Sequence, residues 1–343
     1  MTSDSRGAGG TVETITVAGQ PAFSLRNSVG DQLVVLQHGA QVLSWMTADG
    51  IERMYCTPRL PSTPKPVRGG VPVIFPQFNL RGPDFSLPRH GFARHQPWER
   101  LDAVFAASAL HGASAPAGDH EAGTHVPPPP AAALPAAHVP HDIVGTEDAA
   151  AAGLHAAGLV LGLHANEATR AAWTHDFSLQ LHIRMLPGQL DLQLVLDNLD
   201  PQGCAPMHFT AALHTYFAVT ELIASQVDGL AGSTRVDTLV QPNTQGPAGK
   251  GPLVLTGAID DIYLGVQRPL VLQSGLGRLR IAMSGGFADT VVWNPGPVNA
   301  AAIDDMPDDD WRRMLCVEAA CIGQPAELPP GGRWLAGQHL QVM

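Results

Sequence analysis

The chain has 343 residues, of which 45% are hydrophobic, and it carries a formal net charge of −11 at pH 7. This length allows one large domain or two ordinary ones with a substantial core, and the acidic charge argues against nucleic acid as a partner. No apolar run reaches the roughly 18 residues that a membrane-spanning helix needs, and residues 1–10 lack the apolar core of a signal peptide. We therefore expect a cytoplasmic protein that binds neither nucleic acid nor a membrane.

The expected elements are mostly short β-strands. Residues 33–36 and 40–45 predict a hairpin that turns near His38-Gly39. A strand is expected at 159–163, and residues 177–185 and 190–196 alternate apolar and polar side chains on either side of the turn signal Pro187-Gly188. Further strands are expected at 253–255, 270–272, 279–282 and 290–293. Many short strands without long intervening helices favour an all-β antiparallel sandwich or barrel.

Two segments place arginine beside glycine in otherwise apolar sequence. The first covers residues 65–76 and includes Arg68, and the second covers residues 89–94 and includes Arg89, His90 and Arg94. Guanidinium groups bind anions through paired hydrogen bonds, and glycine lets a ligand approach the backbone. If these side chains converge on one pocket, they would suit a phosphorylated small molecule.

Residues 106–157 break the strand pattern. The segment is rich in alanine, proline, glycine and histidine and has almost no large side chains with which to build a core. We interpret it as a disordered or polyproline-like surface insertion in a single domain that spans residues 11–343. Its six histidines lack regular ligand spacing, so they do not predict a metal site.

The cysteines and the acidic residues do not predict a metal site either. The cysteines form no Cys-x-x-Cys pair, and we interpret them as reduced thiols in or near the core: Cys56, Cys204, Cys316 and Cys321. The acidic run at 304–310 has no nearby histidine, and we interpret it as a solvated loop.

Five motifs in chain order carry a resemblance to a known family. They are Lys65–Pro72, His90–Arg94 followed by Pro97–Glu99, Leu213–Phe217, Asp289–Pro295 and Cys316–Glu318. Together they strongly resemble the hexose-6-phosphate mutarotases (glucose-6-phosphate 1-epimerases) of the aldose 1-epimerase superfamily, from about Leu33 to the C-terminus except for the insertion. The resemblance implies a galactose-mutarotase-like β-supersandwich, no metal, no organic cofactor and a monomer that acts on a sugar phosphate.

Anomer interconversion needs one group that removes the proton of the anomeric hydroxyl and another that protonates the ring oxygen. The resemblance assigns the general base to Glu318, whose apolar strand would raise its pKa by partial burial. It assigns the general acid to His214, which we expect to lie, at least partly buried, within one apolar strand at 211–217. The residues alone leave open an outward-facing glutamate and a core histidine. Two catalytic carboxylates would instead indicate glycoside hydrolysis.

The resemblance also implies the sugar and phosphate contacts. Arg68 and Arg94 match the family's phosphate and sugar ligands, and His90 would hydrogen-bond to the ring oxygen or a nearby hydroxyl, or else hold its own turn. Arg89 stands where relatives often carry glutamine, which leaves the preferred substrate open. This departure from the family's pattern would either add a third positive charge to the site or change which sugar hydroxyl the site recognises.

Asp260 resembles a sugar-binding aspartate, although Asp261 beside it leaves the alignment open by one residue and either could simply begin a turn. Trp293 and Asn294 are candidates for the pocket wall, with Trp293 equally placed to be core. Three functions follow from these patterns: an epimerase of hexose 6-phosphates, glucose 6-phosphate first; an aldose 1-epimerase of unphosphorylated sugars; or a non-catalytic carbohydrate-binding protein.

Overall fold

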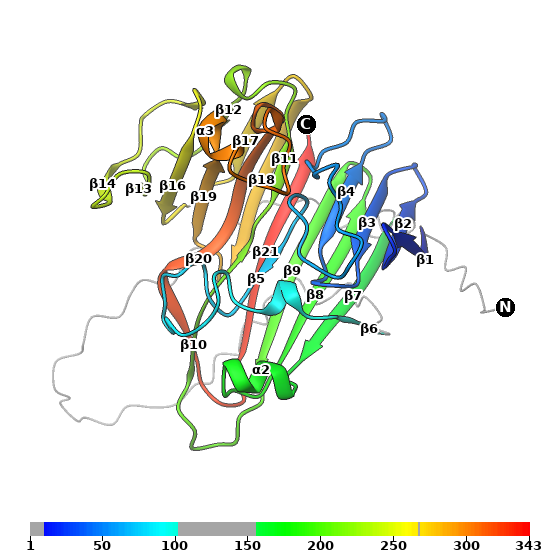
Figure 1. Cartoon of the computed structure of the whole chain (residues 1–343), viewed down its shortest axis with the longest axis vertical. Coiled ribbons are helices and arrows are strands. Elements are labelled where there is room, and N and C mark those ends of the chain that lie inside the picture. The colour runs from blue at the N-terminus through cyan, green and yellow to red at the C-terminus, as the bar shows by residue number, and fades with distance from the viewer. Residues whose placement is uncertain (1–9, 102–155, 267) are drawn as a thin grey trace, which may run out of the picture.

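A computed structural model describes residues 10–101, 156–266 and 268–343 (Figure 1). The predicted insertion at 106–157 lies outside the described residues except for its last two, and Ala157 already begins a strand. All strand pairs within the described sheets are antiparallel, which confirms the predicted fold class.

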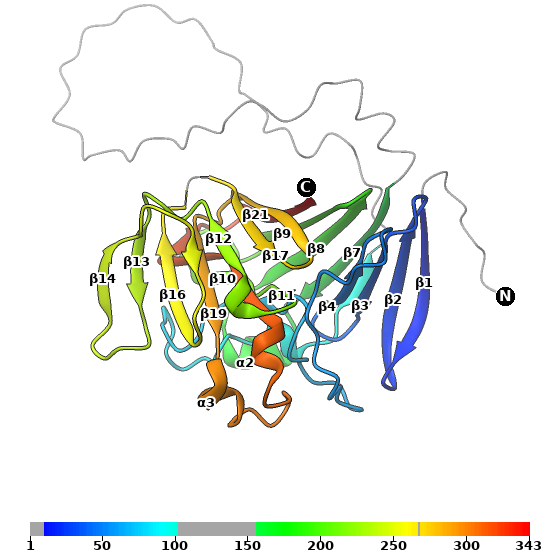
Figure 2. The ribbon, with the colours of Figure 1, turned by 90° about the horizontal axis from the view of Figure 1, so that it is seen from above.

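A four-stranded meander lies at one side of the molecule, in blue in Figures 1 and 2. Its strands follow one another in the order β1 (Gly10–Val17), β2 (Gln20–Asn27), β3 (Gln32–Leu36) and β4 (Val42–Met46). The predicted first hairpin is confirmed, because β3 pairs with β4.

The sheet that carries the candidate site has eight strands within the described residues. Its path is β14 (Thr244–Pro247), β13 (Thr234–Asp237), β16 (Ile259–Leu264), β19 (Asp289–Asn294), β20 (Met314–Leu328), β10 (Met207–Leu213) and β5 (Val73–Ile74). β11 (Tyr216–Ala218) also pairs with β20, beyond the end of β10.

The larger sheet has nine strands in the described part of the chain. Their order is β15 (Leu253–Val254), β12 (Gln226–Asp228), β17 (Leu270–Ser274), β18 (Gly277–Gly285), β21 (Arg333–Val342), β9 (Gln189–Asn198), β8 (Phe177–Leu186), β7 (Ala157–His164) and β6 (Glu99–Leu101). The predicted hairpin around Pro187-Gly188 is confirmed by the pairing of β8 with β9.

In the part of the chain that the structure describes, the helices are short and connect strands. They are α2 (Glu167–Ala172), α3 (Gly296–Ala300) and the 3₁₀ turns η1 (Ala93–His95), η2 (Leu222–Ala224) and η3 (Asp310–Arg313). Asn166 caps α2, since its side chain accepts a hydrogen bond from the N–H of Thr169. Among the residues with a described position, no helix is long and apolar enough to cross a membrane.

The central strand β20 separates the core from the site. Alternate residues of a strand face opposite sides, and Val317 and Ala319 join the main core, which includes the inner side chains of β9 and β21. Gln338 on β21 donates a hydrogen bond to the carbonyl of Val317 at 3.1 Å, so the two sheets are joined there. Cys316 and Glu318 lie on the alternate positions of β20, with Ala320 in a second apolar cluster. That second face holds the candidate site.

Candidate active site

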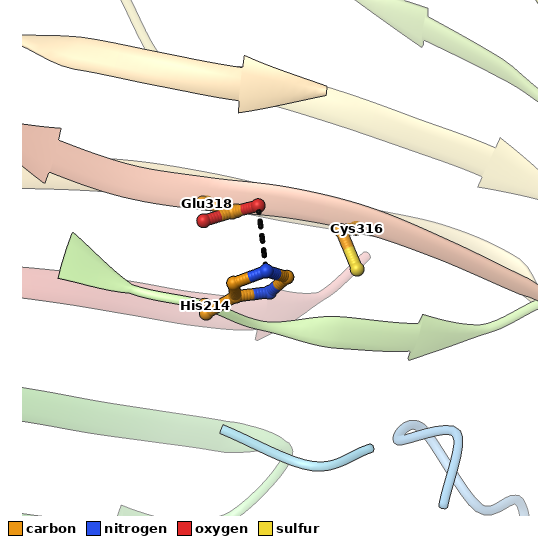
Figure 3. Close-up of side chains that lie close together, drawn as sticks. All are labelled: His214, Cys316 and Glu318. Carbon is orange, nitrogen blue, oxygen red and sulfur yellow. Dashed lines mark ion pairs between the residues drawn. The ribbon is translucent and has the colours of Figure 1, made fainter. Parts of the chain in front are cut away.

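The candidate site forms where the neighbour of β20 breaks. The sequence prediction placed His214 within one apolar strand, and this is wrong: β10 ends at Leu213 and β11 begins at Tyr216. The break places the imidazole of His214 over β20, and its Nε2 lies 3.3 Å from Oε1 of Glu318 (Figure 3). The glutamate side chain is 1% exposed and the histidine side chain 12%.

Backbone hydrogen bonds fix this break in place. The N–H of His214 donates to the carbonyl of Pro72 at 3.1 Å, and the N–H of Val317 donates to the carbonyl of Thr215 at 3.1 Å. The N–H of Tyr216 donates to the carbonyl of Gly70 at 2.8 Å. The segment is therefore held from both sides, by the loop after Arg68 and by β20.

The surroundings of the pair shift its two pKa values in opposite directions. Burial lowers the pKa of His214, the charges of Arg68 and Arg94 add to this effect, and together they bring it to about 3. Burial raises the pKa of Glu318 well above its ordinary value, and Asp260 adds to this effect. Both shifts favour a neutral imidazole beside a protonated carboxyl group. Nδ1 of His214 and Oε2 of Glu318 have no hydrogen-bond partner among the described residues.

Two aromatic rings enclose the histidine. Tyr216 stacks on His214 with ring centroids 4.9 Å apart and planes 11° apart, and Trp293 meets the same ring edge-on at 6.2 Å. Trp293 is partly buried and also packs against Tyr216. Tyr216 was missed as a candidate, although it stands in the quoted motif Leu213–Phe217 and could have been found there.

Arg68 connects this aromatic stack to the acidic segment. Its Nη1 donates to the hydroxyl of Tyr216 at 3.4 Å, and its Nε donates to Oδ1 of Asp305 at 3.0 Å. The carbonyl of Asp305 in turn accepts a hydrogen bond from Thr57. The guanidinium is thus held from one edge, and its side chain is 28% exposed.

Arg89, His90 and Arg94 approach the same pair from a second loop. Nη2 of Arg94 donates to the carbonyl of Arg89 at 3.0 Å, and its Nε is buried without a partner among the described residues. The ring of His90 lies 5.6 Å from that of His214. Arg68, Arg89 and Arg94 all lower the pKa of His214. Arginines of both basic segments, 65–76 and 89–94, therefore lie near this histidine.

His90 is set to donate a hydrogen bond. Its Nδ1 accepts the N–H of Asn79 at 3.2 Å, which leaves the hydrogen of a neutral ring on Nε2. Burial lowers the pKa of His90 to about 2, with further contributions from His214 and Arg94, so the ring is neutral. The residue has a positive φ of 66°, which places it in the left-handed region that L residues rarely adopt.

Glycine is required at two close approaches beside the site. Gly70 has a φ of +59°, and a Cβ there would lie 1.8 Å from the carbonyl oxygen of Val42. Gly91 has a φ of +66°, and its Cβ would lie 2.1 Å from the carbonyl oxygen of Phe75. Neither position accepts a side chain without moving the backbone that holds Arg68 or His90.

Asp260 and Asp261 lie on opposite faces of β16. Asp261 is 1% exposed and binds Arg235 through two hydrogen bonds, of 2.6 and 2.9 Å. Asp260 acts electrostatically on Glu318 and is itself influenced by Arg81 and Arg89, while burial raises its pKa. Asp260 is therefore the one of the two that lies beside the pair, whereas a role for it in sugar binding stays a prediction. Both lie within a strand, not at the start of a turn.

Two expectations about this region are wrong. Asn294 does not line the pocket, since it is 1% exposed and its amide donates to the carbonyls of Trp311 and Met314. The acidic run at 304–310 is only partly solvated: Asp305 binds Arg68, and Asp310 is buried and accepts a hydrogen bond from Tyr55 at 2.9 Å. The contacts of Asp305 and Asp310 join segments more than 200 residues apart, so a local sequence pattern does not predict them.

Cys316 completes the pair's immediate surroundings. Its thiol, Nε2 of His214 and a carboxylate oxygen of Glu318 lie within 4.8 Å of one another (Figure 3). Burial raises the pKa of Cys316 well above its ordinary value, and Glu318 raises it further. Thiols and carboxyl groups bind a metal only when deprotonated, and the three arginines nearby oppose a cation. The arrangement suits proton transfer better than metal binding.

Comparison with known proteins identifies the fold's relatives. The aldose 1-epimerase family model matches residues 21–106 and 146–341. The chain belongs to the aldose 1-epimerase family. The family model does not match residues 107–145, which fall within the predicted insertion. The predicted resemblance is confirmed at the level of the family. Membership of this family places the protein among the epimerases of carbohydrate metabolism.

Individual relatives of this family member are distant. A Cenchrus ciliaris protein named "Putative glucose-6-phosphate 1-epimerase" is 27% identical over 322 residues, which cover 93% of this chain and 84% of the relative. An Escherichia coli K12 protein of the same name is 28% identical over 312 residues, covering 88% and 86%. The solved structure of a "putative mutarotase" from Salmonella typhimurium superposes with a TM-score of 0.72 at 22% identity, over 96% and 93% of the two chains. The chain thus shares its fold with this structure over 96% of its length.

Proposed function

We propose that this protein interconverts the α and β anomers of a hexose 6-phosphate, with glucose 6-phosphate as the preferred substrate. The observation that carries the proposal is the buried pair of His214 and Glu318, whose Nε2 and Oε1 atoms lie 3.3 Å apart, with three arginines acting on the histidine. A proton-transferring pair suits ring opening, and guanidinium groups suit a phosphate ester. The names of the relatives agree with this substrate.

The reaction needs one proton to enter the sugar and one to leave it. In the ring-opening step the pair reacts with its proton on His214: the Glu318 carboxylate takes the proton of the anomeric hydroxyl as the His214 imidazolium gives its proton to the ring oxygen. The bond between that oxygen and the anomeric carbon then breaks. Rotation about the adjacent carbon–carbon bond exposes the other face of the aldehyde. In the closing step each group reverses its role, so the pair ends as it began.

The remaining residues hold the sugar. Arg68, Arg89 and Arg94 bind the phosphate, His90 donates from Nε2 to the ring oxygen or a hydroxyl, and Asp260 accepts from a sugar hydroxyl. The reaction needs no metal or organic cofactor. We also propose that the protein is a cytoplasmic monomer.

Two-dimensional exchange NMR tests the proposal directly. Anomer exchange is measured for glucose 6-phosphate and for glucose at catalytic protein concentration, with Glu318→Gln as the inactive control. We expect faster exchange of the phosphate ester, and a loss of about 10²- to 10⁴-fold in the control. No acceleration of either sugar would favour a carbohydrate-binding protein.

One observation favours a second candidate, an aldose 1-epimerase of unphosphorylated sugars. Asp305 already neutralises Arg68 in part, at 3.0 Å. If glucose exchanges as fast as its 6-phosphate, this second function is the better description.

A further inference from the structure

The charges around the catalytic pair are distributed unevenly. Arg68, Arg94 and Arg89 act on His214 and lower its pKa after burial. Among the described residues, the charge that acts on Glu318 is instead Asp260, which raises its pKa after burial. Cations therefore face the imidazole, and a carboxyl group faces the glutamate.

Contacts connect the arginines to the imidazole side of the pair. Arg68 donates to the hydroxyl of Tyr216, and the ring of Tyr216 stacks on His214 at 4.9 Å. From the other loop, Arg94 acts on His90, whose ring lies 5.6 Å from His214. The anion-binding cluster (Arg68, Arg89 and Arg94) thus borders His214 through two rings.

We propose that the substrate's phosphate activates the enzyme: a dianion bound by the anion-binding cluster moves the pair's proton from Glu318 to His214 and so prepares ring opening. This inference rests on the proposed function and deepens it. No proton enters or leaves the protein in this step, since the carboxyl O–H bond breaks as the imidazolium N–H bond forms.

The physical reason is that the positive charges of the arginines disfavour a proton on His214, and a bound dianion counteracts them. Moving the proton creates a positive charge on the imidazole and a negative charge on the carboxylate. In the free protein the three arginines oppose a positive charge at His214, and a bound dianion offsets much of their repulsion. Because the dianion lies on the histidine side, it stabilises the imidazolium more than it destabilises the carboxylate.

The other groups around His214 do not reverse this effect. They are His90, which is neutral, Tyr216 and Cys316, which burial keeps protonated, the uncharged Trp293, and Asp260 on the glutamate side. Asp305 partly neutralises Arg68 before the substrate arrives. Phosphate should therefore raise turnover as well as affinity, because the binding of a remote group alters the reacting centre.

Sulfate is the probe that separates activation from simple binding. It is a dianion of similar shape, but unlike phosphate it is almost non-basic at neutral pH and does not itself catalyse mutarotation. Anomer exchange of unphosphorylated glucose is measured against sulfate concentration, with chloride at matched ionic strength as the reference. We expect a saturable rise in kcat of about tenfold. This is the effect of a shift of one pKa unit between the two groups, which makes the form with the proton on His214 ten times more populated.

Variants locate the effect. Arg68→Gln and the exposed Arg89→Gln should weaken the response to sulfate, whereas Arg26→Gln, an exposed arginine on β2, should respond like the wild type. In the same experiment sulfate should compete with glucose 6-phosphate. Sulfate therefore inhibits the turnover of glucose 6-phosphate and activates the turnover of glucose.

The outcomes distinguish the two proposals. If sulfate competes with glucose 6-phosphate but leaves glucose turnover at the chloride level, activation is wrong and the proposed function stands. If glucose 6-phosphate exchanges no faster than glucose, the proposed function is wrong, and the activation that rests on it is overturned as well.

Discussion

Glu318→Gln should stabilise the fold increasingly as the pH rises, while it abolishes activity. The buried carboxyl group keeps its proton in the native state because burial raises its pKa. In the unfolded chain the same group ionises around its ordinary pKa of 4.5. Glutamine has nearly the shape of the protonated acid and has no proton to lose.

The magnitude follows from proton linkage. Between pH 4.5 and the raised native pKa, Glu318 binds one proton more in the native state than in the unfolded state, so its contribution to wild-type stability falls as the pH rises. The slope is about 1.4 kcal/mol per pH unit. Glu318→Gln lacks this term, and its advantage in the free energy of unfolding should grow by about 2.7 kcal/mol over two such units.

Urea denaturation at a series of pH values measures this difference. The lowered pKa of His214 affects both proteins alike and cancels in the comparison. A difference that does not change with pH would refute the reasoning, since it would mean that Glu318 is already ionised in the native protein. Anomer exchange on the same samples checks that the variant is inactive.

Three further substitutions test other parts of the site. His214→Asn should remove a contribution of the opposite sign, because the lowered pKa of His214 adds about 1.4 kcal/mol of stability per pH unit from about pH 3 to 6.5. Between pH 4.5 and 6.5 this contribution offsets that of Glu318 in the wild type, so the variant should lose stability as the pH rises, as pH-dependent denaturation would show. Arg68→Gln should raise the KM for glucose 6-phosphate about 10- to 100-fold, the effect of a lost hydrogen bond between charged groups, and equal loss for glucose would contradict phosphate binding. Gly91→Ala should lower stability by roughly 1–3 kcal/mol and displace His90, which thermal melting and turnover together would detect; an unchanged melt would mean that the loop has room to adapt.

Much of the fold could be predicted from alternation alone. The strands β8 and β9 repeat apolar and polar side chains with period two, and the turn at Gly188 has the positive φ that glycine allows. The strands at 253–255, 270–272, 279–282 and 290–293 are confirmed as β15, β17, β18 and β19. β10 and β11 were less predictable, because residues 211–217 contain neither glycine nor proline and so give no signal of a break at His214.

The site was predictable where its residues stand in motifs. His214, Glu318 and the arginines lie in the quoted segments, and the structure brings them together. The partner of Arg68 was not predictable, since Asp305 lies 237 residues away and its position depends on how the chain folds back. Asn294 also lies in a motif, yet its amide holds backbone carbonyls, which a sequence pattern does not distinguish from a ligand contact.

The position of β20 and β21 in the sheets has a consequence for how the protein is made. β20 lies between β19 and β10, and β21 lies between β18 and β9, so the last two strands of the described chain complete the interior of both sheets. Until the ribosome releases them, β10, β19, β9 and β18 each present an unpaired edge, which is the feature that promotes association between chains. A nascent or prematurely terminated chain without these strands therefore lacks the candidate base Glu318 and exposes strand edges in both sheets at once.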